Sequence, residues 1–165
     1  MSFQTISVKE AVNNINANSN GWFLPAVQRP YVWGSRYESE KYICKLFDSI
    51  LNGYPIGTLI VWNTDKEVPY REFMNDYEDG KIATLVDKSL WERTDKWLVY
   101  DGQQRLQTLF SCLKYTLNKR ILAYNLLYKT DNTDEDYGFK FIDKNTDNPG
   151  SVSYTHLRAH ETRHD

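Results

Sequence analysis

The chain has 165 residues, a formal net charge of −2 and 41% hydrophobic residues, values that suit one globular domain. This balance excludes a surface that attracts polyanions everywhere, so contact with a nucleotide or nucleic acid must depend on a local group of Arg and Lys. No apolar run approaches the ~20 residues that span a bilayer, and the first ten residues lack a signal-peptide pattern. Cys44 and Cys112 lie in apolar helical patterns, so we expect two core thiols in a reduced, cytoplasmic protein with no membrane partner.

The first third of the chain predicts two helices on either side of an extended segment. Ser7 and Glu10 have the spacing of a capping box, so a short helix follows and ends in the Asn-rich residues 13–21. Residues 22–27 predict an extended segment that stops before Pro30. A second capping-box pattern at residues 35–38 opens the clearest helix of the sequence. Its apolar face consists of Tyr42, Ile43, Leu46, Phe47, Ile50 and Leu51.

The remainder of the chain predicts strands around one more helix. Residues 57–62 form a continuous apolar run that predicts a buried strand, and the polar residues 64–96 predict an insertion with short helices near residues 71–77. Residues 97–100 predict a strand that turns directly into a helix with Leu106, Leu109, Phe110, Leu113 and Leu117 on its apolar face. Residues 121–128 and 137–142 alternate as strands. The sequence therefore predicts an α+β domain with a small mixed sheet and packed helices.

The last fifteen residues have a different character from the rest. Residues 152–162 look like the translation of a sequencing adapter, so we predict a domain at residues 1–150 and a non-native tail at residues 151–165. We therefore expect the natural protein to continue past Gly150. The competing interpretation is a metal-binding tail, because His156, His160 and His164 repeat every four residues. Residues 1–150 contain no histidine, which excludes histidine-based acid–base chemistry within them.

A first candidate motif surrounds Gln28 and Arg29. Arg29 precedes Pro30 at the end of an extended segment, and a rigid backbone there would hold its guanidinium as a fork for phosphate. Gln28 adds an amide, and Tyr31 and Trp33 could form the wall of a pocket or stack on a base. The alternative is a structural arginine that pairs with an acid, with the aromatic rings in the core.

A second motif follows the strand at residues 97–100. Gly102 permits close backbone approach, and the helix that starts near Gln103 presents N–H groups that favour phosphate. Asp101 could bind a divalent metal ion, Gln103 or Gln104 could orient a water molecule, and Arg105 could neutralise a phosphate oxygen. The alternative is a turn in which Asp101 caps a solvated helix start.

These residues resemble one family. The pattern of Pro25, Gln28-Arg29-Pro30, Trp33, Tyr54-Pro55-Ile56-Gly57 and Asp101-Gly102-Gln103-Gln104-Arg105 is similar to the amino-terminal domain of GmrSD-type restriction proteins. The resemblance implies a fold related to ParB and sulfiredoxin, hydrolysis of a nucleoside triphosphate, and an HNH nuclease partner that cuts modified phage DNA.

The same resemblance implies a set of site residues. Asp101, Gln103, Gln104 and Arg105 would be catalytic, with Asp101 holding Mg²⁺, and the nucleotide phosphates would be bound by Gln28, Arg29, Gly102 and Thr108. Tyr31 and Trp33 would form the pocket wall. The chain departs from the family at Gln107, where the family more often has Thr before Thr108, so a hydroxyl role at Gln107 is not expected.

Three functions follow as hypotheses. The leading one is a nucleoside triphosphatase and regulatory domain of modification-dependent phage defence that acts on DNA through the full-length protein or a partner. The second is a non-enzymatic sensor that binds modified DNA and gates a nuclease. The third is a nicking nuclease that uses Asp101 and a metal ion, and it is the weakest because two-metal cleavage needs more carboxylates than the motifs contain.

Overall fold

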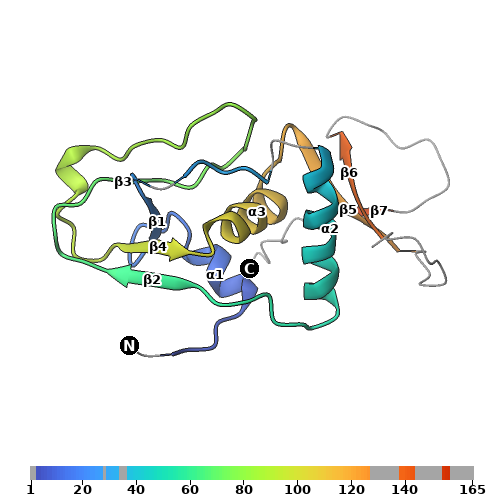
Figure 1. Ribbon diagram of the computed structural model, residues 1–165, viewed down its shortest axis with the longest axis horizontal. Coiled ribbons are helices and arrows are strands. Elements are labelled where there is room, and N and C mark those ends of the chain that lie inside the picture. Colours follow the sequence, from blue (N-terminus) through green and yellow to red (C-terminus); the bar gives the residue numbers. More distant parts are fainter. Residues whose placement is uncertain (1–2, 28, 34–36, 127–137, 144–153, 157–165) are drawn as a thin grey trace, which may run out of the picture. The chain divides into compact units, whose positions relative to one another are not determined.

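A computed structural model describes residues 3–27, 29–33, 37–126, 138–143 and 154–156. The elements of the described residues are α1 Val8–Asn14, β1 Trp22–Pro25, α2 Tyr37–Leu51, β2 Ile60–Asn63, β3 Tyr70–Arg71, η1 Lys88–Leu90, β4 Trp97–Asp101, α3 Gln103–Lys114, β5 Arg120–Asn125, β6 Phe139–Asp143 and β7 Tyr154–His156 (Figure 1). They divide into two compact units. The first unit holds residues 1–32, 57–74 and 81–110, and the second holds residues 33–56, 75–80 and 111–165.

The first unit is built on a four-stranded mixed sheet with the order β2-β4-β1-β3. β1 and β4 run parallel, with Trp22 opposite Trp97 and Phe23 opposite Leu98. β2 lies antiparallel to β4 at one edge, and β3 lies antiparallel to β1 at the other. Together with the helices, this sheet confirms the predicted small α+β architecture.

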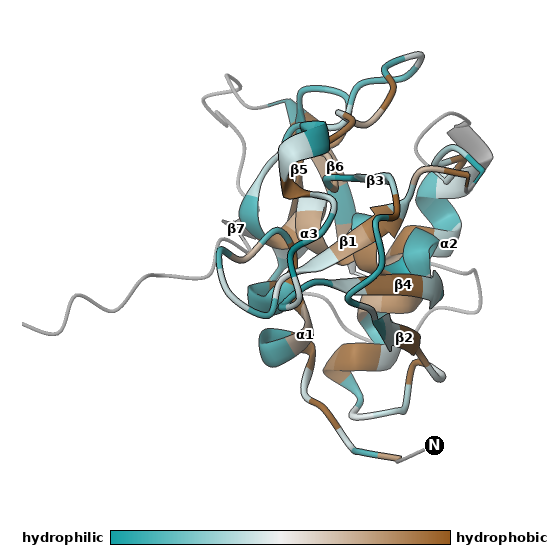
Figure 2. Ribbon diagram, turned by 90° about the vertical axis from the view of Figure 1, so that its left-hand side faces the viewer, coloured by the Kyte–Doolittle hydropathy of each residue, from teal (hydrophilic) through white to brown (hydrophobic). Residues whose placement is uncertain are grey.

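The core of the first unit forms where the two central strands meet the insertion at residues 64–96. Phe23 of β1, Tyr70 of β3 and Leu98 of β4 are buried in contact with one another, and the rings of Phe23 and Tyr70 lie 4.8 Å apart. β4 is largely brown in Figure 2 because its middle residues are apolar. Burial of these side chains is what holds the insertion against the sheet.

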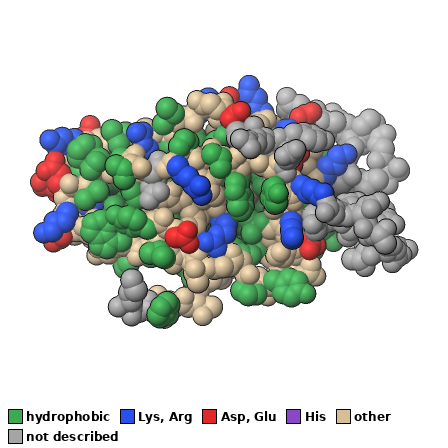
Figure 3. Space-filling view, in the orientation of Figure 1, with side chains coloured by type: hydrophobic (Ala, Val, Ile, Leu, Met, Phe, Trp, Pro, Cys, Tyr) green, Lys and Arg blue, Asp and Glu red, His purple; other side chains and the backbone are tan. Residues whose placement is uncertain are grey.

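The prediction of a buried strand at residues 57–62 was wrong in its burial. The strand forms as β2, but Ile60 is 53% exposed and Trp62 is 40% exposed. Apolar side chains gather over β2 on the face shown in Figure 3. The physical reason is position, because among the strands that the structure describes β2 lies at the edge of its sheet, with β4 as its neighbour. A continuous apolar run therefore does not distinguish an interior strand from an edge strand.

The prediction of a helix near residues 71–77 was also wrong. Tyr70 and Arg71 pair as strand β3 with Pro25 and Leu24 of β1, and Phe73 just beyond is 2% exposed. Pairing with a distant strand and burial of an aromatic side chain override the local preference there. The described helix of the insertion is the single 3₁₀ turn η1.

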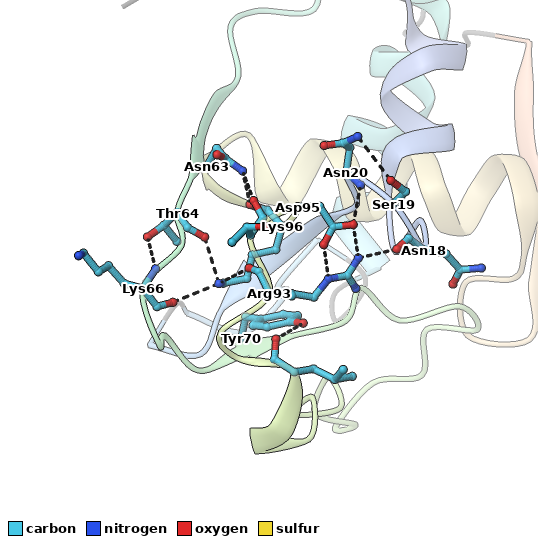
Figure 4. A network of polar contacts seen from close by, with 12 residues as sticks. Asn18, Ser19, Asn20, Asn63, Thr64, Lys66, Tyr70, Arg93, Asp95 and Lys96 are labelled. Atoms are coloured by element: carbon cyan, nitrogen blue, oxygen red, sulfur yellow. Dashed lines mark hydrogen bonds and ion pairs between the residues drawn. The ribbon is translucent and has the colours of Figure 1, made fainter.

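A polar network joins the two ends of the insertion (Figure 4). Lys96 is fully buried, and its ammonium donates to the backbone oxygens of Thr64 at 3.1 Å, Lys66 at 3.1 Å and Arg93 at 2.8 Å. Beside it, Arg93 forms two hydrogen bonds to Asp95, at 2.7 and 2.9 Å. The buried charge is therefore satisfied by carbonyl oxygens, as burial of an ammonium group requires.

Several local predictions are confirmed. Ser7 Oγ accepts from the backbone N–H of Glu10 at 3.2 Å, and the Glu10 carboxylate accepts from the backbone N–H of Ser7 at 2.9 Å, which is a complete capping box. The predicted long helix forms as α2, although its proposed cap at residues 35 and 36 lies outside the described residues. Strand β4 and helix α3 follow one another as expected.

The second unit contains the antiparallel sheet β6-β5-β7 with α2 packed against β6. Phe47 of α2 lies 5.9 Å from Phe139 of β6, measured between ring centroids. The predicted strands at residues 121–128 and 137–142 are confirmed as β5 and β6, and the linking residues 127–137 lie outside the described residues. Cys44 and Cys112 are both buried, and burial raises the pKa of the Cys112 thiol, so the prediction of core cysteines is confirmed.

Strand β7 comes from the segment predicted to be non-native. Residues 154–156 pair with residues 123–125 of β5. His160 and His164 lie outside the described residues, so the metal-binding alternative is not tested. The origin of the segment stays a prediction.

Candidate functional site

The second sequence motif forms a strand–turn–helix. Asp101 is the last residue of β4, and Gly102, with a φ of +89°, turns the chain into α3. A Cβ atom on Gly102 would lie 2.2 Å from Cδ2 of Leu59. Both the backbone conformation and the close approach of Leu59 require glycine at this turn.

Gln103 begins α3 and is tied to the preceding strand. Its side-chain Nε2 donates to the backbone oxygen of Val99 at 2.5 Å, and the residue is only 8% exposed. This hydrogen bond fixes the first turn of the helix on β4. The predicted role of Gln103 in orienting water is not tested by this arrangement.

Gln104 and Thr108 hold the segment that follows Arg29. Gln104 Nε2 donates to the backbone oxygen of Pro30 at 3.1 Å, and Gln104 Oε1 accepts from the backbone N–H of Val32 at 2.9 Å. The hydroxyl oxygens of Tyr31 and Thr108 lie 2.6 Å apart in a hydrogen bond. The two motifs, more than seventy residues apart in sequence, are therefore joined by hydrogen bonds, two between a side chain and the backbone and one between two side chains.

Gln107 likewise holds a segment of the insertion by hydrogen bonds to its backbone. Its Oε1 accepts from the backbone N–H of Met74 at 3.0 Å, and its Nε2 donates to the backbone oxygen of Met74 at 2.7 Å. Asn16 makes the matching pair of bonds with the neighbouring Phe73, at 2.8 and 2.9 Å. The amide of Gln107 is therefore used to anchor the segment that leaves β3.

A pocket of about 150 Å³ lies between these anchored segments, all of them in the first unit. Its polar wall brings together residues of both motifs and of the insertion: Arg29, Tyr31, Arg71, Lys81, Gln103, Gln104 and Gln107. Its apolar wall consists of Leu24, Pro25, Ala26, Pro30, Met74, Ile82 and Ala83. Predicted site residues from two distant parts of the chain thus share one concave site.

The charge of the pocket wall is positive. Arg29, Arg71 and Lys81 line it, and the described lining residues include no Asp or Glu. Arg71 is half-buried and its Nη1 donates to the backbone oxygen of Ala83 at 2.9 Å, whereas Arg29 and Lys81 are exposed. A small cavity with cations and amide groups on its wall favours an anionic ligand.

Arg71 and Lys81 were missed by the sequence analysis. They belong to the insertion, where no motif or periodicity singled out a residue. They line the pocket because β3 pairs with β1 and because Gln107 binds Met74. Neither contact leaves a local signal in the sequence.

Asp101 and Arg105 lie apart from the lining of this pocket. Arg105 Nη2 donates to the backbone oxygen of Thr58 at 2.6 Å and lies 3.4 Å from Asp101 Oδ2. The Asp101 side chain is 58% exposed. The close packing extends to Gly57, where an added Cβ would lie 2.2 Å from Arg105 Nη1. The motif is therefore divided. Gln103 and Gln104 line the pocket, whereas the Asp101–Arg105 ion pair lies beside residues 57–59.

The other predicted site residues are dispersed or outside the described part of the chain. Gln28 lies outside the described residues, and Trp33 is half-buried in the second unit. Thr108 contacts Tyr31 but is not part of the pocket lining.

The described side chains do not form a protein-only metal centre. Within the described ranges there is no group of three or more His, Cys, Asp or Glu that could hold a metal ion. Asp101 alone fits Mg²⁺ only in the way that nucleotide-binding proteins use, where phosphate oxygens and water complete the ligand set. In the same ranges, no helix has the length and apolar character needed to span a bilayer.

Comparison with known proteins identifies the family. A family model described as the N-terminal domain of GmrSD restriction endonuclease matches residues 8–163, nearly the whole chain. A search of curated proteins found no match. The family match confirms the resemblance inferred from the Gln28-Arg29-Pro30 and Asp101–Arg105 motifs. The chain therefore belongs to the GmrSD restriction endonuclease N-terminal domain family and is a component of a restriction system.

Proposed function

We propose that this chain binds a nucleoside triphosphate by its phosphate groups and hydrolyses it, as the regulatory domain of a modification-dependent DNA restriction protein. The observation that carries the proposal is the pocket beside the start of α3, whose lining combines Arg29 with Gln103 and Gln104, the first two residues of the helix. Arginine and the N-terminus of a helix are two of the main means by which proteins bind phosphate.

The size of the pocket supports a phosphate ligand. Pockets that enclose drug-sized molecules have volumes of roughly 300–1,000 Å³, whereas this one measures about 150 Å³. The phosphate groups would enter the pocket and the nucleoside would lie at its mouth. Tyr31, a half-buried residue of the pocket lining, is held by its hydrogen bond to Thr108, so this part of the wall is fixed.

Hydrolysis would need groups beyond the pocket wall. A water oxygen forms a bond to the terminal phosphorus while the bond from that phosphorus to the bridging oxygen breaks, which releases inorganic phosphate. Mg²⁺, when bound, would neutralise charge on the phosphate oxygens, with Asp101 as its protein ligand. Arg105, which lies 3.4 Å from Asp101, would orient that carboxylate and add positive charge.

In this proposal, nucleotide turnover regulates a nuclease. The family description as a restriction endonuclease domain supports DNA as the final target. An HNH-type nuclease domain, in the same chain or in a partner, would be the cutting component, as the resemblance to GmrSD-type proteins implies. The nucleotide state of the pocket would control the partner.

The second candidate is a non-enzymatic sensor that binds modified DNA and gates a nuclease. A specific observation favours it: the described lining of the pocket contains no carboxylate to act as a general base, and Asp101 does not belong to that lining. A DNA phosphate or an unpaired base could occupy such a pocket without reaction.

The test begins with the full chain, each of the four nucleoside triphosphates and Mg²⁺, with released inorganic phosphate as the readout. We expect release with at least one nucleotide, and a loss of binding of about tenfold in Arg29→Ala, since hydrogen bonds to charged groups are the strong ones. Lys9→Ala, an exposed lysine of α1 outside the pocket, is the matched control. No phosphate release, with selective binding of modified over unmodified duplex DNA, would establish the sensor instead.

A further inference from the structure

We infer that the backbone of Gly57 and Thr58 forms a cradle that holds the guanidinium of Arg105, so that Gly57 is a positioning residue for the proposed hydrolysis. The inference rests on the proposed function in giving Arg105 a role in the reaction. Gly57 ends the Tyr54-Pro55-Ile56-Gly57 motif of the sequence and is not part of the pocket lining. Its contact with Arg105 gives this glycine a role of its own.

The close approach of Gly57 to Arg105 is the first support. A Cβ atom on Gly57 would lie 2.2 Å from Nη1 of Arg105 and 3.3 Å from its Cζ. The guanidinium therefore occupies the space in which any other residue would begin its side chain. Because Nη1 is the far end of a long side chain, an added methyl group would displace the guanidinium more readily than it would displace the backbone.

The backbone of the cradle is the second support. Gly57 has a φ of +103°, a conformation that residues with a side chain rarely adopt. The next residue, Thr58, accepts a hydrogen bond at its backbone oxygen from Arg105 Nη2, at 2.6 Å. Gly57 thus leaves room for one terminal nitrogen of the guanidinium, and the carbonyl of Thr58 accepts from the other.

The turn after β4 also contacts the guanidinium. Arg105 Nη2 lies 3.4 Å from Asp101 Oδ2, and a Cβ atom on Gly102 would lie 3.3 Å from the same nitrogen. The guanidinium therefore lies close to two glycine backbones, one before β2 and one after β4, and the Arg105 side chain is only 21% exposed. A planar fork that is fixed on a carbonyl and a carboxylate is oriented before a ligand arrives.

A β-bulge sets Asp101 beside the cradle. Strands β2 and β4 are antiparallel neighbours (Figure 1), with Val61 opposite Val99 but Ile60 opposite Asp101. One step along β2 thus corresponds to two steps along β4, which makes Tyr100 the extra residue. Bulges are common beside active sites, where they re-aim a side chain. This bulge places Asp101 opposite the start of the strand that follows the cradle.

The first test is a double-mutant cycle of Gly57→Ala and Arg105→Ala, measured by urea unfolding of the full chain. In the wild type, Gly57→Ala introduces backbone strain and also meets the guanidinium, whereas in Arg105→Ala the strain alone remains. Gly53→Ala is the matched control, since Gly53 has a φ of +73° and an added Cβ would meet no atom within 4 Å. The cycle needs no enzymatic activity.

We expect Gly57→Ala to raise the unfolding equilibrium constant about tenfold more in the wild type than in Arg105→Ala, because only the wild type has a guanidinium to displace. Gly53→Ala should have the same effect in both backgrounds. A double variant that folds where Gly57→Ala alone does not would support the inference equally. Equal effects of Gly57→Ala in the two backgrounds, or failure of both proteins to fold, overturn the inference, because the glycine would then serve the backbone alone.

The second test is steady-state kinetics in a preparation that hydrolyses a nucleotide, at a temperature where unfolding curves show each variant fully folded. Because Arg105 lies outside the pocket lining, Gly57→Ala should lower kcat by about a hundredfold and leave KM within about twofold, as misplacement of a reacting group does. Gly53→Ala should retain both constants. An unchanged kcat in Gly57→Ala overturns the inference and leaves the proposed function intact. Coupling between Gly57 and Arg105, with no hydrolysis of any nucleotide by the wild type, supports the cradle while it ends the proposed hydrolysis.

Discussion

Gln107 of α3 pairs with Met74 of the insertion through both polar atoms of its side-chain amide, at 3.0 and 2.7 Å. The side chain of Gln107 is almost fully buried, with the residue 2% exposed. This amide therefore satisfies both backbone hydrogen-bonding groups of Met74, as a neighbouring strand would, and it fixes the backbone three residues after Arg71.

Replacement of Gln107 tests this anchor. Gln107→Leu keeps the volume but leaves the N–H and C=O of Met74 without these partners, so the free energy of unfolding should fall by about 1–3 kcal/mol. Urea unfolding of the wild type and the variant measures the change. Gln107→Glu is the informative companion, because its carboxylate can accept from Met74 but cannot donate. Wild-type stability in Gln107→Leu would show that the pair contributes nothing.

The hydrogen bond between Tyr31 and Thr108 supplies a second prediction. Tyr31→Phe removes a hydroxyl that lies 2.6 Å from Thr108 Oγ1 and should lower the free energy of unfolding by about 1 kcal/mol. A double-mutant cycle with Thr108→Val should return a coupling energy of about 1 kcal/mol, because the two groups contact each other directly. Strictly additive effects of the two substitutions would mean that the hydrogen bond contributes nothing to the free energy of unfolding.

Asp101 and Arg105 are the test of the proposed catalysis. In a preparation that hydrolyses a nucleoside triphosphate, Asp101→Ala and Arg105→Ala should each abolish the release of phosphate. Asp65→Ala, which removes an exposed carboxylate of the same unit, should leave it unchanged. Full activity in either of the first two variants would end the assignment.

Arg105 needs an additional control because it also has a structural contact. Its Nη2 donates to the backbone oxygen of Thr58 at 2.6 Å, so its loss could loosen residues 57–59. Thermal unfolding of Arg105→Ala separates the two effects. A large fall in melting temperature would assign the loss of activity to folding, and an unchanged one would assign it to chemistry.

Asp95 makes the free energy of unfolding depend on pH in the acidic range. Hydrogen bonds from Arg93 lower the pKa of Asp95 from 3.8 to about 2. Because the folded-state pKa is lower than the unfolded one, this carboxylate stabilises the fold fully above about pH 4, and the contribution is lost as the pH falls through about 2. Asp95→Asn should therefore show a smaller loss of stability than the wild type between pH 4 and pH 2. An identical pH dependence in the two proteins would contradict this role.

Much of the local structure could be predicted from the sequence. The capping box of Ser7 and Glu10, the long helix α2 and the passage from β4 through Gly102 into α3 all depend on residues within a few positions of one another. Periodicity, capping side chains and a glycine with positive φ act over this short range. The two motifs could be recognised for the same reason, since each is contiguous.

Only the tertiary structure decided how these pieces act together. It made β2 an exposed edge strand, paired Arg71 with Leu24 where a helix was predicted, and separated the glutamines of the second motif from its Asp101–Arg105 pair. These outcomes depend on contacts between residues tens of positions apart, and the free energy of such contacts is not encoded in any local pattern. A local sequence signal can therefore identify the two motifs, whereas Arg71 and Lys81 of the insertion join them around one pocket only when distant strands pair.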